Sequence, residues 1–404
     1  MSRIEIIRNE CPASDCALAM ELMRQAEMEK VTAFHKSFPQ YTETPLVKLD
    51  ALAAKLGVRG IYVKDESHRF KLNAFKVLGG SYAMARYIAK LTGEDISKMT
   101  YERLTSKELR EQIGQITFFT ATDGNHGRGV AWAANKLGQK AVVYMPAGSS
   151  QTRLANIKAE GAEASIIDGN YDDAVRLAAA HSAKVPKSVV VQDTAWEGYE
   201  EIPGWIMQGY GTMAAEAERQ IKQYAAVPTH IFIQAGVGSL AGAVQGFYSN
   251  VYGEKCPVVT VVEPDAAACL FESGKAKDYR KVGGAMRTIM AGLACGEPNT
   301  ISWKILKNHA SFFASCPDWV SAKGMRILAS PLRGDMQVVS GESGAVGMGL
   351  LACVMADGGD YSGFRDMLGL TKDSVVLLFS TEGDTDPQKY QDIVWDGEYS
   401  SLPV

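Results

Sequence analysis

One lysine, two aspartates and a glycine-rich turn are the residues of this chain whose types and spacing could do chemistry. The lysine is Lys76, which follows Asn73 in the stretch FKLNAFKVLGGSY (70–82). Asn73 is a good helix N-cap residue, so we expect Lys76 in the first helical turn. There the positive end of the helix dipole disfavours a protonated amine, and Schiff-base chemistry needs a neutral amine. Taken alone this pattern is weak, because a lysine at a helix start is usually a solvated surface group.

The two aspartates each follow an apolar run that is typical of a strand. Asp123 comes after ITFFTA (116–121) and opens a Gly-Asn-His-Gly turn, and Asp193 ends SVVVQD (188–193). Ligands of open α/β sheets bind beyond the carboxyl ends of the strands, so both side chains are candidate acid/base groups. In the alternative interpretations, Asp123 caps the helix that starts near Asn125 and Asp193 is an ordinary strand-end residue. We expect His126 mainly to hold the turn.

The glycine-rich turn lies in QAGVGSLAGAV (234–244), after a predicted strand and before a predicted helix. Backbone N–H groups in such a turn, together with the helix N-terminus, favour a bound phosphate. The residues that we expect around the phosphate are Gly236, Val237, Gly238, Ser239 and Leu240. The same stretch also fits a dinucleotide fingerprint that ends at Ala241, with Glu263 near the place of a ribose-binding acid. An NAD-dependent dehydrogenase is therefore an alternative at this point.

Predicted strands and helices alternate along most of the chain, which indicates parallel sheets covered by helices on both faces. The polar stretch 93–115 is where the chain is expected to cross between domains. We predict a large domain made of 1–92 and 220–404, with a smaller domain, 93–219, inserted in it. The predicted strands are 60–65, 116–121, 141–146, 164–168, 188–193, 229–235, 258–263 and 374–380. The predicted helices are 126–137, 152–160, 172–182, 205–223 and 239–249.

The composition points to a small-molecule ligand in a reducing compartment. A formal net charge of −4 provides no basic field for nucleic acid or an anionic membrane. The N-terminus does not resemble a secretory signal, and no apolar run approaches membrane-spanning length. The seven cysteines form no Cys-x-x-Cys motif, so we expect a cytoplasmic protein with free thiols, although Cys269 and Cys295 could form a redox pair. The histidines lack ligand-like spacing, so no metal site is expected.

Several motifs together resemble those of the tryptophan-synthase-β-like (fold type II) pyridoxal-phosphate enzymes, in family order and over most of the chain. They are Asn73-Ala-Phe-Lys76, Asp123-Gly-Asn125-His126-Gly127, QGYGTMAAE (208–216), Gly236-Val-Gly238-Ser239-Leu240 and Ser380-Thr381-Glu-Gly383. The resemblance implies two open, mostly parallel sheets, a pyridoxal 5'-phosphate cofactor and a homodimer.

The resemblance also implies roles for single residues. Lys76 would form the Schiff base with the cofactor, Asn125 would contact the cofactor ring oxygen, and Thr381 would place a hydroxyl on the pyridine nitrogen. Related serine and threonine dehydratases have a small residue where Asp123 stands. A carboxylate there suits an ammonium leaving group, so the expected reaction is α,β-elimination from 2,3-diaminopropionate to pyruvate and two ammonia.

Two aspartates and the lysine share the proton chemistry in this interpretation. Asp123 would be the base for one enantiomer, Lys76 the base for the other, and Asp193 a second acid/base group. A serine/threonine dehydratase of the same family and, with less support, an NAD-dependent dehydrogenase are the alternative enzymes. A non-catalytic binding protein would not explain a lysine and two acids at strand ends.

Overall fold

The computed structural model describes residues 3–122, 124–356 and 358–400. Its contacts divide the chain into two compact units. The first unit is Met1–Arg24, Glu43–His68 and Met213–Val404, and the second is Gln25–Thr42 and Arg69–Thr212. The division falls within the long helix α10 (Glu201–Gln223).

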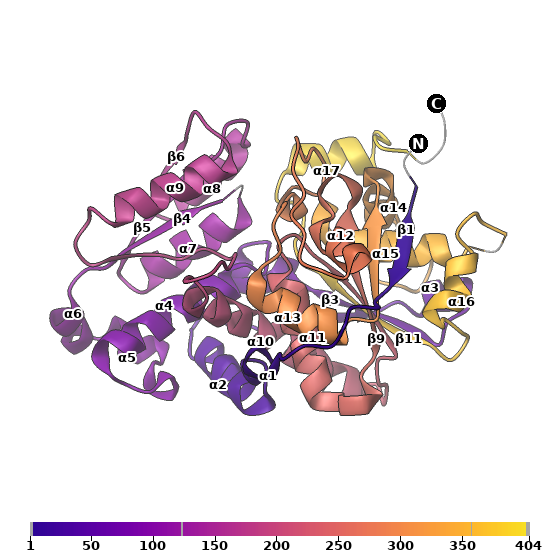
Figure 1. Cartoon of the computed structure of the whole chain (residues 1–404), viewed down its shortest axis with the longest axis horizontal. Coiled ribbons are helices and arrows are strands. Elements are labelled where there is room, and N and C mark those ends of the chain that lie inside the picture. The colour runs from indigo at the N-terminus through magenta and orange to yellow at the C-terminus, as the bar shows by residue number, and fades with distance from the viewer. Residues whose placement is uncertain (1–2, 123, 357, 401–404) are drawn as a thin grey trace. The chain divides into compact units, whose positions relative to one another are not determined.

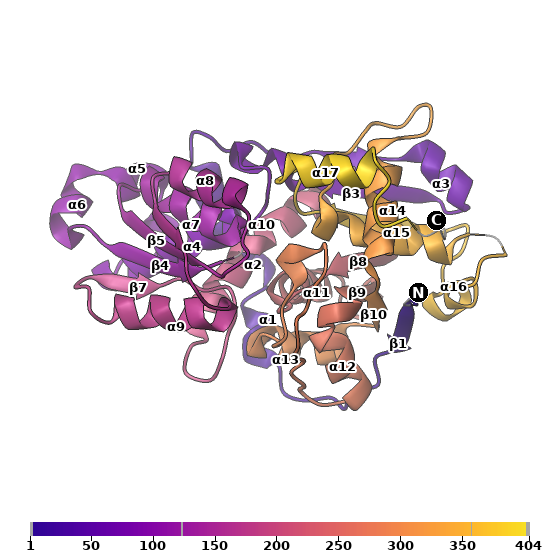
Figure 2. The same ribbon diagram turned by 90° about the horizontal axis from the view of Figure 1, so that it is seen from above.

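The first unit contains a seven-stranded sheet with the order β1-β10-β9-β8-β11-β3-β2. The five inner strands are parallel, while β1 and β2 pair antiparallel at the two edges. Figure 2 shows β8, β9, β10 and β1 in succession across this sheet. The strands are β1 (Glu5–Arg8), β2 (Leu46–Lys48), β3 (Gly60–Asp65), β8 (His230–Gln234), β9 (Val258–Pro264), β10 (Phe312–Cys316) and β11 (Val375–Ser380). The helices of this unit are α1 (Ala17–Glu21), α3 (Asp50–Leu56), α11 (Ser239–Tyr252), α12 (Cys269–Ala276), α13 (Thr300–His309), α14 (Asp318–Ala329), α15 (Glu342–Val354), α16 (Gly363–Leu368) and α17 (Pro387–Val394).

The second unit contains a four-stranded parallel sheet with the order β6-β5-β4-β7. Helices α7 and α9 both pack on it, and Figure 1 shows them on its two sides. The strands are β4 (Thr117–Ala121), β5 (Lys140–Met145), β6 (Glu163–Ile166) and β7 (Ser188–Val190). The helices are α2 (Gln25–Lys36), α4 (Val77–Thr92), α5 (Tyr101–Thr105), α6 (Lys107–Ile113), α7 (Asn125–Lys136), α8 (Gln151–Ala159) and α9 (Tyr171–Ser182).

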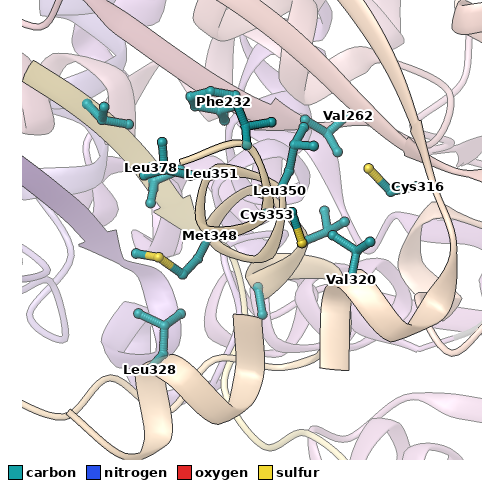
Figure 3. Close-up of a cluster of buried hydrophobic side chains, with 14 of the residues drawn as sticks. Phe232, Val262, Cys316, Val320, Leu328, Met348, Leu350, Leu351, Cys353 and Leu378 are labelled. Carbon is teal, nitrogen blue, oxygen red and sulfur yellow. The ribbon is translucent and has the colours of Figure 1, made fainter. Parts of the chain in front are cut away.

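Helix α15 forms the centre of the core in the first unit. All of its residues are buried, and it packs on α14 and against β8 and β11. Figure 3 looks along this helix, with Phe232 of β8, Leu378 of β11 and Val320 of α14 around it. Close packing of this kind fixes the strand ends, because a core at crystal-like density resists small shifts. The ends of β8 and β11 carry the candidate cofactor contacts of this unit.

The predicted fold class is confirmed, since both sheets are mostly parallel and covered by helices. Three strands were not predicted, namely β1, β2 and β10. The first two are short antiparallel edge strands. The third, Phe312–Cys316, contains no β-branched residue, so its sequence lacks the usual strand signal. Among the described residues, no helix combines the length and apolar character that a membrane span needs.

The division into units differs from the expected boundaries at 93 and 219. The second unit also takes 25–42 and 69–92, and it ends at Thr212. The physical reason is helix packing. Helix α4 contacts α7 and α2 of the second unit, whereas 43–68, earlier in the chain, belongs to the first unit. The long polar stretch after α4 is therefore internal to one unit.

Candidate active site

Lys76 and Asp193 form an ion pair in the second unit. Lys76 Nζ lies 2.5 Å from Asp193 Oδ2, and their side chains are 20% and 9% exposed. Burial alone would raise the pKa of the Asp193 carboxyl, but Lys76 and then His126 outweigh this effect and lower the pKa to about 2. Asp193 is therefore ionised at neutral pH.

Lys76 precedes helix α4 rather than lying within its first turn. It occupies the N-cap position, and its carbonyl accepts a hydrogen bond from Gly80 N–H at 3.3 Å. The prediction that Asn73 caps the helix was wrong. Phe70, Lys71 and Asn73 all have positive φ angles (49°, 61° and 60°), so the chain turns irregularly before the helix begins. The amine still lies at the positive end of the helix dipole.

A close approach of α7 to this helix start fixes the Lys76 backbone. A Cβ atom on Gly129 of α7 would lie 2.7 Å from Val77 N and 3.0 Å from Lys76 C, so only glycine fits there. At the start of α7, His126 Nε2 donates to Val191 O at 2.9 Å. The other ring nitrogen, Nδ1, lies 3.9 Å from Asp193 Oδ2. His126 thus holds the turn, as expected, and also contributes to the electrostatic environment of Asp193.

Two aromatic rings lie beside the Lys76 amine. Lys76 Nζ is 5.5 Å from the ring centroid of Phe75 and 5.8 Å from that of Tyr210. Burial raises the pKa of Tyr210, although Lys76 acts in the opposite direction, so this side chain stays a neutral phenol. Tyr210 was not recognised from sequence, although the motif QGYGTMAAE that contains it was.

Asn125 is the first residue of α7 and is half-buried. Asp123 lies outside the described residues, and its expected role stays a prediction. The described residues around it are anchored by Thr122, whose Oγ1 accepts hydrogen bonds from Gly124 N–H (2.9 Å) and Gly127 N–H (3.1 Å).

The glycine-rich turn of the first unit joins β8 to α11. Gly238 has a φ of +95° and precedes the first residue of α11, Ser239, while Gly236 and Val237 are partly exposed. The first amide groups of a helix have no partner within it, so a turn at this place can bind an anion. The turn is therefore a candidate site for a phosphate.

Asn299 holds this turn in place and was missed by sequence reasoning. Its backbone N–H donates to Val237 O at 2.7 Å, and its Nδ2 donates to Ser239 Oγ at 2.8 Å. Its Oδ1 accepts hydrogen bonds from Ile301 and Ser302 N–H and so caps α13. Asn299 is fully buried, and its contact with Ser239 joins residues 60 positions apart in the chain, so no local sequence pattern marks it.

Thr381 follows the end of β11 and is buried. Its Oγ1 accepts a hydrogen bond from Gln234 Nε2 at 2.8 Å, and the same amide nitrogen donates to Phe379 O at 2.8 Å. Since this hydroxyl oxygen acts as an acceptor for Gln234, its proton can be directed to an acceptor such as a pyridine nitrogen. The arrangement fits the role that the resemblance implies.

Glu263 does not have the environment of a ribose-binding acid. It is fully buried, and its two carboxylate oxygens accept hydrogen bonds from Leu270 N–H (2.9 Å) and Phe271 N–H (2.6 Å) at the start of α12. Burial raises its pKa to about 8, although these two amides act in the opposite direction. The feature that favoured a dehydrogenase is therefore part of a helix cap.

All seven cysteines are thiols in this structure, Cys269 and Cys295 included. Cys269 Sγ donates to Gly236 O at 3.7 Å. Within the described part of the chain, no group of three or more His, Cys, Asp and Glu side chains is arranged to hold a metal ion.

Each unit thus holds groups that suit a phosphorylated aldehyde cofactor, namely a lysine beside a carboxylate in the second unit, and a glycine turn and a buried hydroxyl in the first. These residue types indicate an α/β enzyme of this cofactor class. The family model described as "Pyridoxal-phosphate dependent enzyme" matches residues 38–366, and the chain belongs to this family. Pyridoxal phosphate is accordingly its cofactor, and the residues described above fit that group.

The chain is similar over nearly its whole length to one member of this family. It is 50% identical to diaminopropionate ammonia-lyase of Escherichia coli K12 over 383 residues, which are 95% of this chain and 94% of the relative. The crystal structure of the holo enzyme from E. coli matches with a TM-score of 0.92 and 47% identity over 99% of both chains. A structure of the same enzyme with an aminoacrylate-PLP azomethine reaction intermediate matches with a TM-score of 0.90 and 46% identity over 98% of both chains.

Proposed function

We propose that this protein eliminates ammonia from 2,3-diaminopropionate to give 2-aminoacrylate, which hydrolyses to pyruvate and a second ammonia. The observation that carries the proposal is the Lys76–Asp193 pair, in a chain 50% identical to an enzyme of that activity. When bound, pyridoxal phosphate supplies an electron sink for the negative charge that remains after the α-proton leaves. The other steps are assigned to residues of the chain.

Three parts of the chain would hold the cofactor. The Lys76 amine would bind its aldehyde carbon, and the amides of Gly236, Val237, Gly238, Ser239 and Leu240 would bind its phosphate. The Thr381 hydroxyl would donate to the pyridine nitrogen, and Asn125 would contact the ring oxygen. A neutral hydroxyl does not keep the pyridine nitrogen protonated. A cofactor held in this way would supply a restrained electron sink, which suits an elimination.

Asp193 would select a cationic leaving group. Its pKa of about 2 makes it a weak base at neutral pH, so binding a cation suits it better than removing a proton. The negative charge of Asp193 could pair with the β-ammonium of diaminopropionate, whereas the neutral hydroxyl of serine or threonine offers no such charge.

Proton transfer at the α-carbon would come from two groups. Lys76, once displaced from the cofactor, would act as the base for one enantiomer. Asp123, on the sequence argument, would act as the base for the other. Substitution of Asp123 by serine should therefore keep the cofactor bound and remove most activity on one enantiomer only.

The proposal is tested by spectra and by ammonia release. The purified protein should be yellow, and Lys76→Ala should lose the visible band of the bound cofactor together with turnover. Ammonia release should be faster from diaminopropionate than from L-serine or L-threonine. A colourless wild type that the cofactor does not reconstitute contradicts the cofactor assignment, and a preference for threonine contradicts the substrate assignment. We also expect a homodimer, which size-exclusion chromatography with light scattering tests.

A further inference from the structure

Gln192 stands directly before Asp193 and joins two strand ends in the second unit. The backbone ladder between β4 and β7 ends where Val191 N–H donates to Phe119 O at 2.8 Å. Beyond that point the Gln192 side chain replaces the missing strand. Its Oε1 accepts from Ala121 N–H at 3.0 Å, and its Nε2 donates to Ala121 O at 3.1 Å.

Further hydrogen bonds fix the Gln192 amide in one orientation. Its Oε1 also accepts from Thr120 Oγ1 at 3.1 Å, and its Nε2 is 2.5 Å from Tyr171 Oη. The Gln192 backbone N–H donates to Tyr199 Oη at 3.0 Å instead of to a strand. Gln192, Thr120 and Ala121 are all fully buried. The amide therefore satisfies buried backbone groups that have no water to replace it.

We infer that Gln192 is a positioning residue for the elimination, which sets the place of Asp193 relative to Lys76 by tying the end of β7 to the end of β4. This inference rests on the proposed function. The side-chain link lets the backbone leave the sheet after Val191 while its position stays fixed. Asp193 can then turn toward the Lys76 amine, and Val191 O remains available to His126. Misplacement by about 1 Å can cost about 100-fold in rate, so a fixed strand end matters.

A matched control exists at the other end of β4. Gln139 is also buried, and its Oε1 accepts from the backbone N–H of Ile116 at 2.7 Å. It therefore makes the same kind of bond to the same strand, at the end without acid/base groups. The substitutions Gln192→Met and Gln139→Met remove comparable amides and keep the side-chain length.

The experiment compares the two variants as holoenzymes with diaminopropionate. We expect Gln192→Met to lower kcat about 10- to 100-fold, with KM within about threefold and the cofactor band retained. Gln139→Met should keep kcat within about twofold and should lower Tm less than Gln192→Met, because the Gln192 amide bonds more buried groups. Combined with Asp193→Asn, Gln192→Met should have almost no further effect on kcat, because it acts through Asp193. Equal kcat values for the two glutamine variants, or additive effects with Asp193→Asn, overturn the inference.

A readout without turnover separates this inference from the proposed function. Hydrogen exchange followed by mass spectrometry should show faster exchange of 119–122 in Gln192→Met and of 115–117 in Gln139→Met. If the wild type fails to act on diaminopropionate but the exchange pattern holds, the substrate assignment fails and the link between the strand ends stands. Unchanged exchange at 119–122 overturns the inference. If Gln192→Met does not fold, Gln192→Glu, which keeps the acceptor oxygen, serves for the same comparison.

Discussion

The strand ends of the two sheets carry buried carboxylates with opposite properties. Asp193, after β7 of the four-stranded sheet, is paired with a lysine, and its pKa is lowered to about 2. Glu263, in β9 of the seven-stranded sheet, accepts hydrogen bonds from the Leu270 and Phe271 amides and from the Cys269 thiol, and burial raises its pKa to about 8. One edge therefore holds fixed charge at neutral pH, and the other avoids it.

This difference matches the chemistry proposed for the two edges. Proton transfer and recognition of an ammonium need ionisable groups, which Lys76, His126 and Asp193 supply. A phosphate dianion needs donors and no competing negative charge nearby, which the turn at Gly236–Gly238 and a largely protonated Glu263 supply. Opposite pKa shifts in buried carboxylates thus indicate a division of roles.

The largest expected effect is on turnover when the charged edge is altered. Asp193→Asn removes the negative charge beside Lys76 and keeps the side-chain shape. We expect kcat on diaminopropionate to fall about 10²- to 10⁴-fold, the range of a lost acid/base or charge-stabilising group, with the cofactor still bound. Steady-state kinetics and the visible spectrum measure this. Asp173→Asn, in an exposed pair with Arg176, is the control. A kcat within threefold of the wild type would remove Asp193 from the mechanism.

The next largest effect is expected on stability, at the buried ion pair of Lys64 and Glu216, which has no role in the proposed reaction. Lys64 Nζ lies 2.7 Å from Glu216 Oε2, 2.7 Å from Thr44 O and 2.9 Å from Gln220 Oε1, and both charged side chains are 0% exposed. Lys64→Met removes a cation that lies beside a buried carboxylate, so we expect a loss of about 3–5 kcal/mol in the free energy of unfolding. Denaturant titration measures it.

The double variant Lys64→Met/Glu216→Leu should recover part of this loss, because it removes both buried charges. Lys107→Met, in an exposed pair with Glu111, should cost less than about 1 kcal/mol. If Lys64→Met costs no more than the exposed control, the buried pair tolerates the loss of its lysine and the prediction is contradicted.

The sequence predicted candidate residues at both strand edges, but it did not predict the residues that hold them in place. Lys76, Asp193 and the glycines are signalled locally by a strand, a turn and the start of a helix. Asn299 and Gln192 act through contacts 60 and 71 residues away, to Ser239 and Ala121, which a local pattern does not reveal. Asn73 was assigned wrongly because asparagine is a common N-cap residue. In the structure it has a φ of +60°, and the N-cap position of α4 is taken by Lys76.

The fold followed from the strand–helix alternation, but its edges and the assignment of α4 did not. Edge strands such as β2 are too short to show a period, and the place of α4 depends on packing against α7. Local sequence propensity predicts neither the short edge strands nor the packing of α4.

A smaller effect, on the affinity for the cofactor, is expected when the glycine turn at Gly236–Gly238 is altered. Gly238→Ala would place a Cβ atom 2.8 Å from Ser302 Oγ and 3.0 Å from Leu270 Cδ1, at a φ of +95°. Strain of about 1–3 kcal/mol corresponds to roughly 10- to 100-fold weaker cofactor binding, with kcat recovered at saturating cofactor. Gly253→Ala, at the other end of α11 and also at positive φ, meets nothing within 4 Å and should leave the affinity unchanged. Equal affinities in both variants would argue against a phosphate at this turn.

The smallest effect concerns the pH dependence contributed by Glu263. Burial raises its pKa from the usual 4.5 to about 8 on folding, so the folded state retains a proton that the unfolded state has lost. Stability is then lost as pH rises from about 4.5 to about 8, at up to about 1.4 kcal/mol per pH unit. Glu263→Gln does not titrate, so the difference in unfolding free energy between wild type and variant should shift in favour of the variant across this range. Denaturant titrations at fixed cofactor from pH 5 to 8.5 measure it. A difference that stays constant would mean that the Leu270 and Phe271 amides keep the carboxylate ionised, and the contrast with Asp193 would then lie only in the partner and not in the charge.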